Sequence, residues 1–197
     1  MIGGGVGAGL LLAWRIWPRT QSLNLAVREG ETALGAFLKI GKDNRVTVAV
    51  PQAEMGQGVW TALPQILADA LGADWRMIGV EPAPIGPAYA NLSLRHSLGK
   101  MVLPEWAGPV GRFIKSWPED ADQLQATIGS NSIPSFHDSF QRAGDIARAL
   151  LCMAAADKWE TDWKSLETRG GCVINGAERP AFGELAEAAA GYDPPGE

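Results

Sequence analysis

The sequence predicts a mixed α/β fold, because patterns typical of strands and of helices alternate along the chain. Residues 36–50 first alternate in polarity and then fill with β-branched side chains, as strands do. Two longer stretches, from about residue 60 to 71 and from about residue 138 to 159, repeat apolar residues at the spacing of one helix face. We therefore expect one domain of short strands and at least two helices.

The first half of the chain is predicted to form a hairpin, a helix and a further strand. The turn-forming residues 41–44 separate the two strands of the hairpin. Proline is tolerated in the first turn of a helix, so Pro64 places the helix start between Trp60 and Leu63, and Gly72 ends the helix. Residues 77–81 are then predicted to form the next strand.

The second half begins with an irregular stretch, residues 88–125, which is predicted to be a long loop. Asp138 is expected to cap the following helix, with Gln141 three residues later. Two short strands near residues 165–168 and 172–175 and a small helix at 182–188 complete the prediction. The expected buried stripe of the long helix consists of Phe140, Ala143, Ala147, Leu150, Leu151 and Ala154.

Composition limits the classes of partner and of chemistry. The 197 residues carry a formal charge of −5 without a long basic run, so we expect no nucleic acid partner. Eight tryptophans indicate contact with other chains or with a membrane. Cys152 is expected to be a buried inert thiol, although a disulfide to Cys172 stays open. Neither cysteine nor either histidine has a partner at metal-ligand spacing, and no catalytic set is predicted.

Residues 1–19 are predicted to form a membrane anchor or signal-like segment. As a helix, the uncharged residues 1–14 would span about 21 Å, which is short of the roughly 30 Å hydrocarbon core. A signal-peptide core, an anchor that begins upstream and a buried glycine-rich segment are the three alternatives. Trp14 and Trp17 beside two arginines resemble an interfacial belt, and no cleavage motif follows closely, which favours an uncleaved anchor.

Two polar turns are the candidate binding elements. The first, Glu54–Gly58, stands before the helix near residue 60, where glycines, free N–H groups and the Gln57 amide would suit an anionic cofactor. The second, Thr127–Ser132, gathers hydroxyl and N–H groups shortly before the long helix. Each alone is more often a structural turn. The candidate cofactor-binding residues are Gly56, Gln57, Gly58, Thr127, Ser130 and Ser132.

These turns and their surroundings resemble the start of isoquinoline 1-oxidoreductase beta subunits and of related periplasmic aldehyde dehydrogenases. These proteins form a branch of the xanthine dehydrogenase/aldehyde oxidase superfamily. The likeness runs from about residue 36 to residue 195. It is carried by Phe37–Ile40, Val46–Val48, Pro51–Pro64 with its Met-Gly-Gln-Gly motif, Ala68–Leu71, Val80–Pro84, Tyr89–Asn91 and the Thr-x-Gly-Ser-x-Ser stretch at Thr127–Ser132.

The resemblance implies that residues 20–190 are part of a molybdopterin-binding domain, with residues 191–197 as a linker or truncated end. In the superfamily both motifs bind molybdopterin, here expected as its cytosine dinucleotide, through the glutamine and the Thr/Ser hydroxyls. Ile133 and Pro134 depart from the pattern after Ser132, which puts some contacts of the second turn in doubt.

The resemblance also implies an enzyme larger than this chain. Related subunits are several times longer and carry their catalytic glutamate near the far C-terminus, so the chain alone is expected to be inactive. The whole enzyme would hydroxylate aldehydes or N-heterocycles with oxygen from water, at the periplasmic face of the inner membrane. Its partners would be the remainder of the subunit, a 2Fe-2S subunit and a haem c cytochrome. The alternative is a non-catalytic, membrane-anchored assembly module that binds no cofactor.

Overall fold

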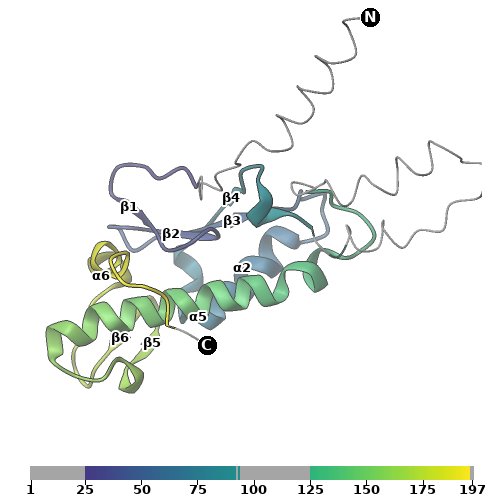
Figure 1. Cartoon of the computed structure of the whole chain (residues 1–197). Helices are drawn as coiled ribbons and strands as arrows, with labels where there is room; N and C mark the ends of the chain where they lie inside the picture. Colours follow the sequence, from purple (N-terminus) through teal and green to yellow (C-terminus); the bar gives the residue numbers. More distant parts are fainter. Residues whose placement is uncertain (1–24, 92, 94–124, 196–197) are drawn as a thin grey trace, which may run out of the picture.

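The computed structural model describes residues 25–91, 93 and 125–195 (Figure 1). The predicted anchor, residues 1–19, lies outside the described residues, and so does most of the predicted loop between residues 88 and 125. Within the described ranges, no helix is both long enough and apolar enough to cross a membrane.

A four-stranded sheet confirms the predicted hairpin and the strand after it. Its spatial order follows the chain, with antiparallel pairing from the first strand to the third and parallel pairing between the third and the fourth. Together with the helices, this sheet confirms the mixed α/β class. The strands are β1 (Glu31–Ala33), β2 (Leu38–Gly41), β3 (Val46–Val50) and β4 (Ile78–Pro82).

Helix α2 (Val59–Leu71) connects the parallel strands β3 and β4. It begins one residue before the predicted range and ends at Gly72, whose left-handed backbone (φ 75°) lets its N–H bond the last turn, as predicted. Pro64 lies in the second turn rather than the first, as the sixth helical residue. Because proline lacks an N–H group, the helix lacks one backbone hydrogen bond at that point.

Helix α5 (Ser132–Trp159) begins six residues earlier than predicted. Asp138 is therefore an exposed residue inside the helix and does not cap it. The early start is possible because Pro134 is the third helical residue, where no intrahelical partner exists for an N–H group. The Thr127–Ser132 stretch consequently runs directly into the helix.

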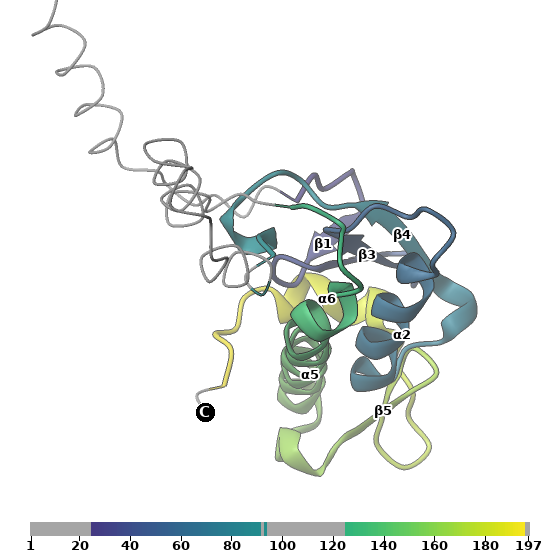
Figure 2. The ribbon, with the colours of Figure 1, turned by 90° about the vertical axis from the view of Figure 1, so that its right-hand side faces the viewer.

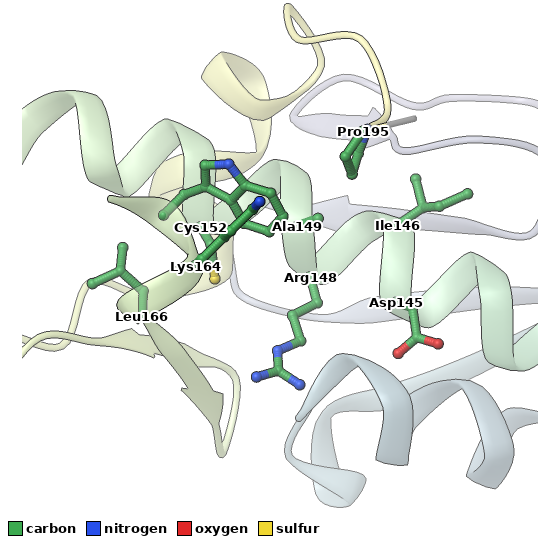
Figure 3. A pocket seen from close by; sticks show the side chains of 9 residues that line it. Asp145, Ile146, Arg148, Ala149, Cys152, Lys164, Leu166 and Pro195 are labelled. Atoms are coloured by element: carbon green, nitrogen blue, oxygen red, sulfur yellow. The ribbon is translucent and has the colours of Figure 1, made fainter. Parts of the chain in front are cut away.

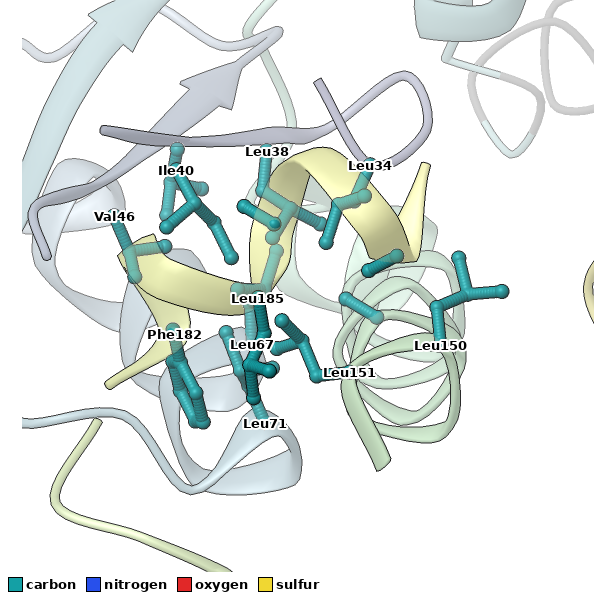
Figure 4. Close-up of a cluster of buried hydrophobic side chains, with 14 of the residues drawn as sticks. Leu34, Leu38, Ile40, Val46, Leu67, Leu71, Leu150, Leu151, Phe182 and Leu185 are labelled. Carbon is teal, nitrogen blue, oxygen red and sulfur yellow. The ribbon is translucent and has the colours of Figure 1, made fainter. Parts of the chain in front are cut away.

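The hydrophobic core lies between the sheet and the helices, which cover one face of it (Figures 1 and 2). Helix α6 (Phe182–Ala189), predicted as a small helix, packs on β2 and on α5. Figure 4 shows leucines of β2, α2, α5 and α6 meeting in this layer. The predicted stripe of α5 is confirmed: Phe140, Ala147, Leu150, Leu151 and Ala154 are buried, and Ala143 is partly buried against them.

The predicted pair of short strands forms a separate two-stranded sheet, β5 (Glu167–Arg169) and β6 (Cys172–Ile174). Asn44 ties the hairpin turn to this region: its amide donates to the Gly171 carbonyl at 3.1 Å and accepts from the Gly183 N–H at 3.0 Å. Three short 3-10 helices fill the connections: η1 (Trp75–Met77), η2 (Pro87–Tyr89) and η4 (Trp163–Ser165).

Cys152 and Cys172 are both free thiols, so the structure holds no disulfide between them. Burial raises the pKa of the Cys152 thiol, and the charge of Arg148 only partly opposes it. The thiol is therefore neutral near pH 7, as expected for an inert core cysteine.

Lys39 is a buried cation that the sequence pattern did not single out. Its side chain is 2% exposed, and its Nζ lies 3.0 Å from carboxylate oxygens of Glu31 and Glu81 and 2.7 Å from the Ala26 carbonyl oxygen. Burial acts to lower the pKa of Lys39, but the two carboxylates outweigh it and raise that pKa above its ordinary value. The ion cluster joins β1, β2 and β4.

We predict that Gly144→Ala lowers the free energy of unfolding by about 1–3 kcal/mol through overpacking. A Cβ atom at this position would lie 2.6 Å from the Leu67 carbonyl oxygen and 2.7 Å from the Ala70 Cβ. In an unconstrained helix interior the same change stabilises by roughly 0.5–1 kcal/mol, so the sign itself is diagnostic. Urea unfolding measures it, with the exposed Gln141→Ala on the same helix as control. A Gly144→Ala protein as stable as the wild type would show that α2 and α5 do not pack this closely.

Candidate functional site

Three connecting segments meet at the carboxyl ends of the parallel strands β3 and β4. They are residues 51–58 after β3, residues 83–91 after β4 and residues 125–131 before α5. Gln125 donates its side-chain amide to the Pro84 carbonyl at 2.8 Å, which ties the last two segments together. In α/β sheets this edge is where ligands usually bind. The candidate site therefore lies here.

Of the two polar turns that the sequence singled out, the second is hydrogen-bonded to the residues directly before the first. We call Glu54–Gly58 the Gln57 turn and Thr127–Ser132 the Ser130 turn. The Ala53 N–H, just before the Gln57 turn, donates to the Thr127 hydroxyl oxygen at 2.9 Å. The Ser132 hydroxyl donates to the Gln52 side-chain oxygen at 2.8 Å. Residues about 75 positions apart in the sequence thus form one continuous polar surface.

The Gln57 turn has the open glycines that close approach by a ligand requires. Gly56 (φ 94°) and Gly58 (φ 82°) adopt left-handed conformations, and a Cβ atom at either would meet no atom within 4 Å. The exposed Gln57 side chain, however, bonds its own turn: it accepts from the Met55 N–H at 2.6 Å and donates to the Ala53 carbonyl at 2.8 Å. A primary amide has two N–H donors, so one of them remains for a ligand.

The Glu54 carboxylate occupies the N–H groups at the start of α2. It accepts from the N–H groups of Gly56 at 2.8 Å, Gly58 at 3.0 Å and Trp60 at 2.9 Å. The hydrogen bonds from Trp60 and Gly58 hold the pKa of Glu54 below its ordinary value. The expectation that these N–H groups are free for an anion is therefore wrong, because the chain supplies its own anion.

In the Ser130 turn, fewer of the polar groups are hydrogen-bonded within the chain than in the Gln57 turn. Gly129 and Ser130 adopt left-handed conformations (φ 67° and 53°), and no atom would lie within 4 Å of a Cβ at Gly129. The N-cap residue of α5, Asn131, makes no side-chain capping bond, and the first turn of α5 has no acidic residue. The Ser130 side chain is exposed, whereas the Ser132 hydroxyl proton is already committed to Gln52.

Two buried amides support this edge, and the sequence reading gave neither a role. Gln52 (3% exposed) accepts from Ser132 and, through its backbone carbonyl, from the Trp60 indole at 2.7 Å. Asn91 (fully buried) accepts from the Ser135 hydroxyl at 3.0 Å and donates to Asn131 Oδ1 at 3.2 Å. The position of Gln52, a polar residue shortly after a strand of apolar residues, could have indicated its role in the sequence.

A pocket of about 330 Å³ lies elsewhere, between the second half of α5, η4 and the C-terminal segment (Figure 3). Arg148, Cys152 and Lys164 are among its lining residues. Cys152 is twenty residues beyond Ser132, which corresponds to about 30 Å along a helix. This pocket is therefore separate from the polar edge.

The described residues contain no group of three or more His, Cys, Asp or Glu side chains that could hold a metal ion. His137 lies on α5 with its Nδ1 3.0 Å from the Asp138 carboxylate, both exposed. His96 lies outside the described residues.

Residues 6–84 match the model of the molybdopterin cofactor-binding domain, a range that includes the Gln57 turn but not the Ser130 turn. The chain is 28% identical over 152 residues to isoquinoline 1-oxidoreductase subunit beta of Brevundimonas diminuta, covering 76% of this chain and 16% of that protein. It is 24% identical over 187 residues to the membrane-bound aldehyde dehydrogenase (pyrroloquinoline-quinone) of Gluconacetobacter polyoxogenes, covering 91% of this chain and 20% of that protein.

Among solved structures, quinoline 2-oxidoreductase from Pseudomonas putida 86 matches with a TM-score of 0.49 and 19% identity, covering 77% of this chain and 15% of that chain. The chain thus spans one fifth or less of the length of each of these proteins. The match to the domain model and to the beta subunit confirms the resemblance seen in the sequence. These comparisons support a molybdopterin-binding fragment of the kind found in the xanthine oxidase family.

Proposed function

We propose that this chain forms one wall of the molybdopterin site of a molybdenum hydroxylase. The observation that carries the proposal is the direct bonding of the Gln57 turn region to the Ser130 turn, through Ala53–Thr127 and Gln52–Ser132. The family resemblance assigns cofactor contacts to both turns, and a shared site requires them to lie side by side.

The donors that remain at this edge fit a pterin with a phosphate. The second N–H of the Gln57 amide suits a pterin heteroatom, and Gly56 and Gly58 let the ligand approach the backbone. The hydroxyl protons of Thr127 and Ser130 suit phosphate oxygens. Ser132 acts one step away, by holding Gln52. We propose the cytosine dinucleotide form of the cofactor, as the resemblance implies.

When bound, the cofactor would supply molybdenum chemistry that hydroxylates an aldehyde or an N-heterocycle with oxygen from water. The catalytic glutamate would come from the remainder of the subunit, so this chain alone would be inactive. A 2Fe-2S subunit and a haem c cytochrome would accept the electrons. These proposals rest on the resemblance and on the names of the two sequence relatives.

A periplasmic position at the inner membrane belongs to the same proposal. One relative is named as membrane-bound, and residues 1–14 of this chain are uncharged and apolar. The tryptophans and arginines between Trp14 and Arg19 would then lie at the membrane surface.

A second candidate function is a non-catalytic assembly module that binds no cofactor. It is favoured by one observation: the Glu54 carboxylate already pairs the N–H groups of Gly56 and Gly58 in the Gln57 turn and of Trp60 in α2. Molybdenum analysis and cofactor extraction of the complex purified through this chain separate the two functions. Molybdopterin in the extract supports the first, pyrroloquinoline quinone without molybdenum contradicts it, and neither cofactor supports the module.

We predict that Gln57→Ala reduces cofactor retention by roughly two- to tenfold, because a hydrogen bond to a neutral ligand group contributes about 0.5–1.5 kcal/mol. Part of this effect would come from the turn, since the amide also bonds Met55 and Ala53. The free energy of unfolding should change little at this exposed position. The measurement is molybdenum content per folded complex.

Leu150→Ala is the matched control for Gln57→Ala. Leu150 is buried in the core, so its truncation should cost on the order of 2–5 kcal/mol of stability and lose cofactor only in proportion to unfolding. Wild-type molybdenum content in Gln57→Ala would show that the turn is structural and would favour the assembly module.

We also predict that deletion of residues 1–18 releases the complex into the soluble fraction. The apolar stretch and its Trp/Arg border would no longer contact lipid. Fractionation of cells followed by immunoblotting measures the distribution. A full-length complex that is already soluble without detergent would contradict the anchor.

A further inference from the structure

We infer that Glu54 is a positioning residue that closes the start of α2 to anions and fixes the Gln57 amide for a neutral part of the ligand. The second half of this inference rests on the proposed function. The first half concerns only residues of this chain and is testable without cofactor.

The geometry shows why the start of α2 is closed. One Glu54 oxygen, Oε1, accepts from the N–H groups of Gly56 and Gly58, and the other, Oε2, accepts from Trp60. A phosphate bound at this helix terminus would need these same N–H groups. It would also meet the negative charge of Glu54 at contact distance, where like charges repel most strongly. An anion here would therefore have to compete with Glu54 for these three N–H groups.

Glu54 replaces an ordinary helix cap. The N-cap position of α2 is Gly58, which has no side chain, and its left-handed backbone (φ 82°) is a conformation that glycine adopts readily. Capping residues usually stand at the N-cap itself. Here the cap comes from four residues upstream, so the carboxylate has to bridge the whole turn. A change at Glu54 should consequently move Gln57 as well.

Glu54 and Gln57 together satisfy the turn from within. Between them, their side chains accept from the N–H groups of Met55, Gly56, Gly58 and Trp60. The turn is thus built before any ligand arrives, and the open side of its glycines faces outward. What it offers a ligand is the second Gln57 N–H and an uncharged backbone surface, which suits a pterin ring better than a phosphate.

The Ser130 turn provides the contrast. The first turn of α5 contains no acidic residue, and Asn131 makes no side-chain capping bond. Of the two helices that begin at this edge, one therefore carries an internal anion and the other does not. In the proposed site, this difference would orient the cofactor, with its phosphate at α5 and its ring at α2.

The test is a titration of the full chain with inorganic pyrophosphate, followed by backbone amide NMR signals. In the wild type, the signals of Gly56, Gly58 and Trp60 should not shift at millimolar pyrophosphate. In Glu54→Gln, which removes the charge but keeps the size, the affinity measured at these three amides should rise by about tenfold or more. Glu187→Gln, an exposed change of equal charge on α6, should behave as the wild type.

A pH titration gives a second readout, because only a charged Glu54 would make these amide signals depend on pH. The pKa of Glu54 is lowered by the N–H bonds, so its contribution to the turn is present above the unfolded-state pKa and is lost as pH falls through the folded-state pKa. The three amide signals should therefore titrate together below pH 4.5, the ordinary carboxyl value. In Glu54→Gln this transition should be absent, and Glu54→Asp should restore a transition.

Equal pyrophosphate shifts in the wild type and in Glu54→Gln would overturn the inference, because the N–H groups would then be available despite Glu54. Absence of shifts in both would overturn it too, since Glu54 would not be what excludes the anion. Urea unfolding confirms that each variant is folded before titration. A complex without molybdenum would refute the proposed function while leaving the exclusion of pyrophosphate by Glu54 intact.

Discussion

The close crossing of α2 and α5 is the constraint on which the rest of the structure depends. At Gly144 the α5 backbone lies so near Leu67 and Ala70 that a methyl group would not fit. Both helices begin at the same edge of the sheet, as the bonds from the Ser130 turn to Gln52 and Ala53 show. The packing of two long elements thus fixes the relative position of two short turns, which have little contact area of their own.

At that edge, we propose that function depends on which polar groups are hydrogen-bonded within the chain and which remain exposed to a ligand. Glu54 and Gln57 satisfy most of the backbone of one turn, whereas Ser130 and the first turn of α5 keep donors exposed. A buried polar group without a partner is costly, so Gln52 and Asn91 are both hydrogen-bonded. The outcome is a hydrogen-bonded polar surface that leaves few donors free.

Local patterns were enough to predict most elements of this fold. The β-branched run before Pro51 predicted β3, and the apolar spacing from Phe140 to Ala154 predicted the buried face of α5. The predicted start of α5 was wrong because it depended on Asp138 as the cap. The helix begins before Asp138, and Pro134 fits its first turn. The predicted position of Pro64 in the first turn of α2 was also wrong, because tertiary packing holds this helix together despite the lost backbone bond.

The candidate site was only partly predictable. Its two turns were found from glycine and hydroxyl content. Gly56, Gln57, Gly58, Thr127 and Ser130 remain predicted cofactor contacts, whereas the hydroxyl of Ser132, predicted with them, donates to Gln52. Their contact with each other was not readable, because it depends on residues about 75 positions apart. The burial of Lys39 between Glu31 and Glu81 depends likewise on strand pairing. Glu54 was part of the predicted turn, but the sequence did not indicate that its carboxylate binds the N–H groups of Gly56, Gly58 and Trp60.

A double-mutant cycle of Gln57→Ala and Thr127→Val tests most directly whether the two turns form one site. Thr127→Val keeps the shape of the side chain but removes the hydroxyl that accepts from Ala53, whose carbonyl holds Gln57. The quantity to measure is the rate of molybdenum loss from the purified complex in the wild type, both single variants and the double variant. A single site predicts an interaction energy of about 0.5 kcal/mol or more between the two changes. Effects that add without interaction would contradict it and would leave two independent turns.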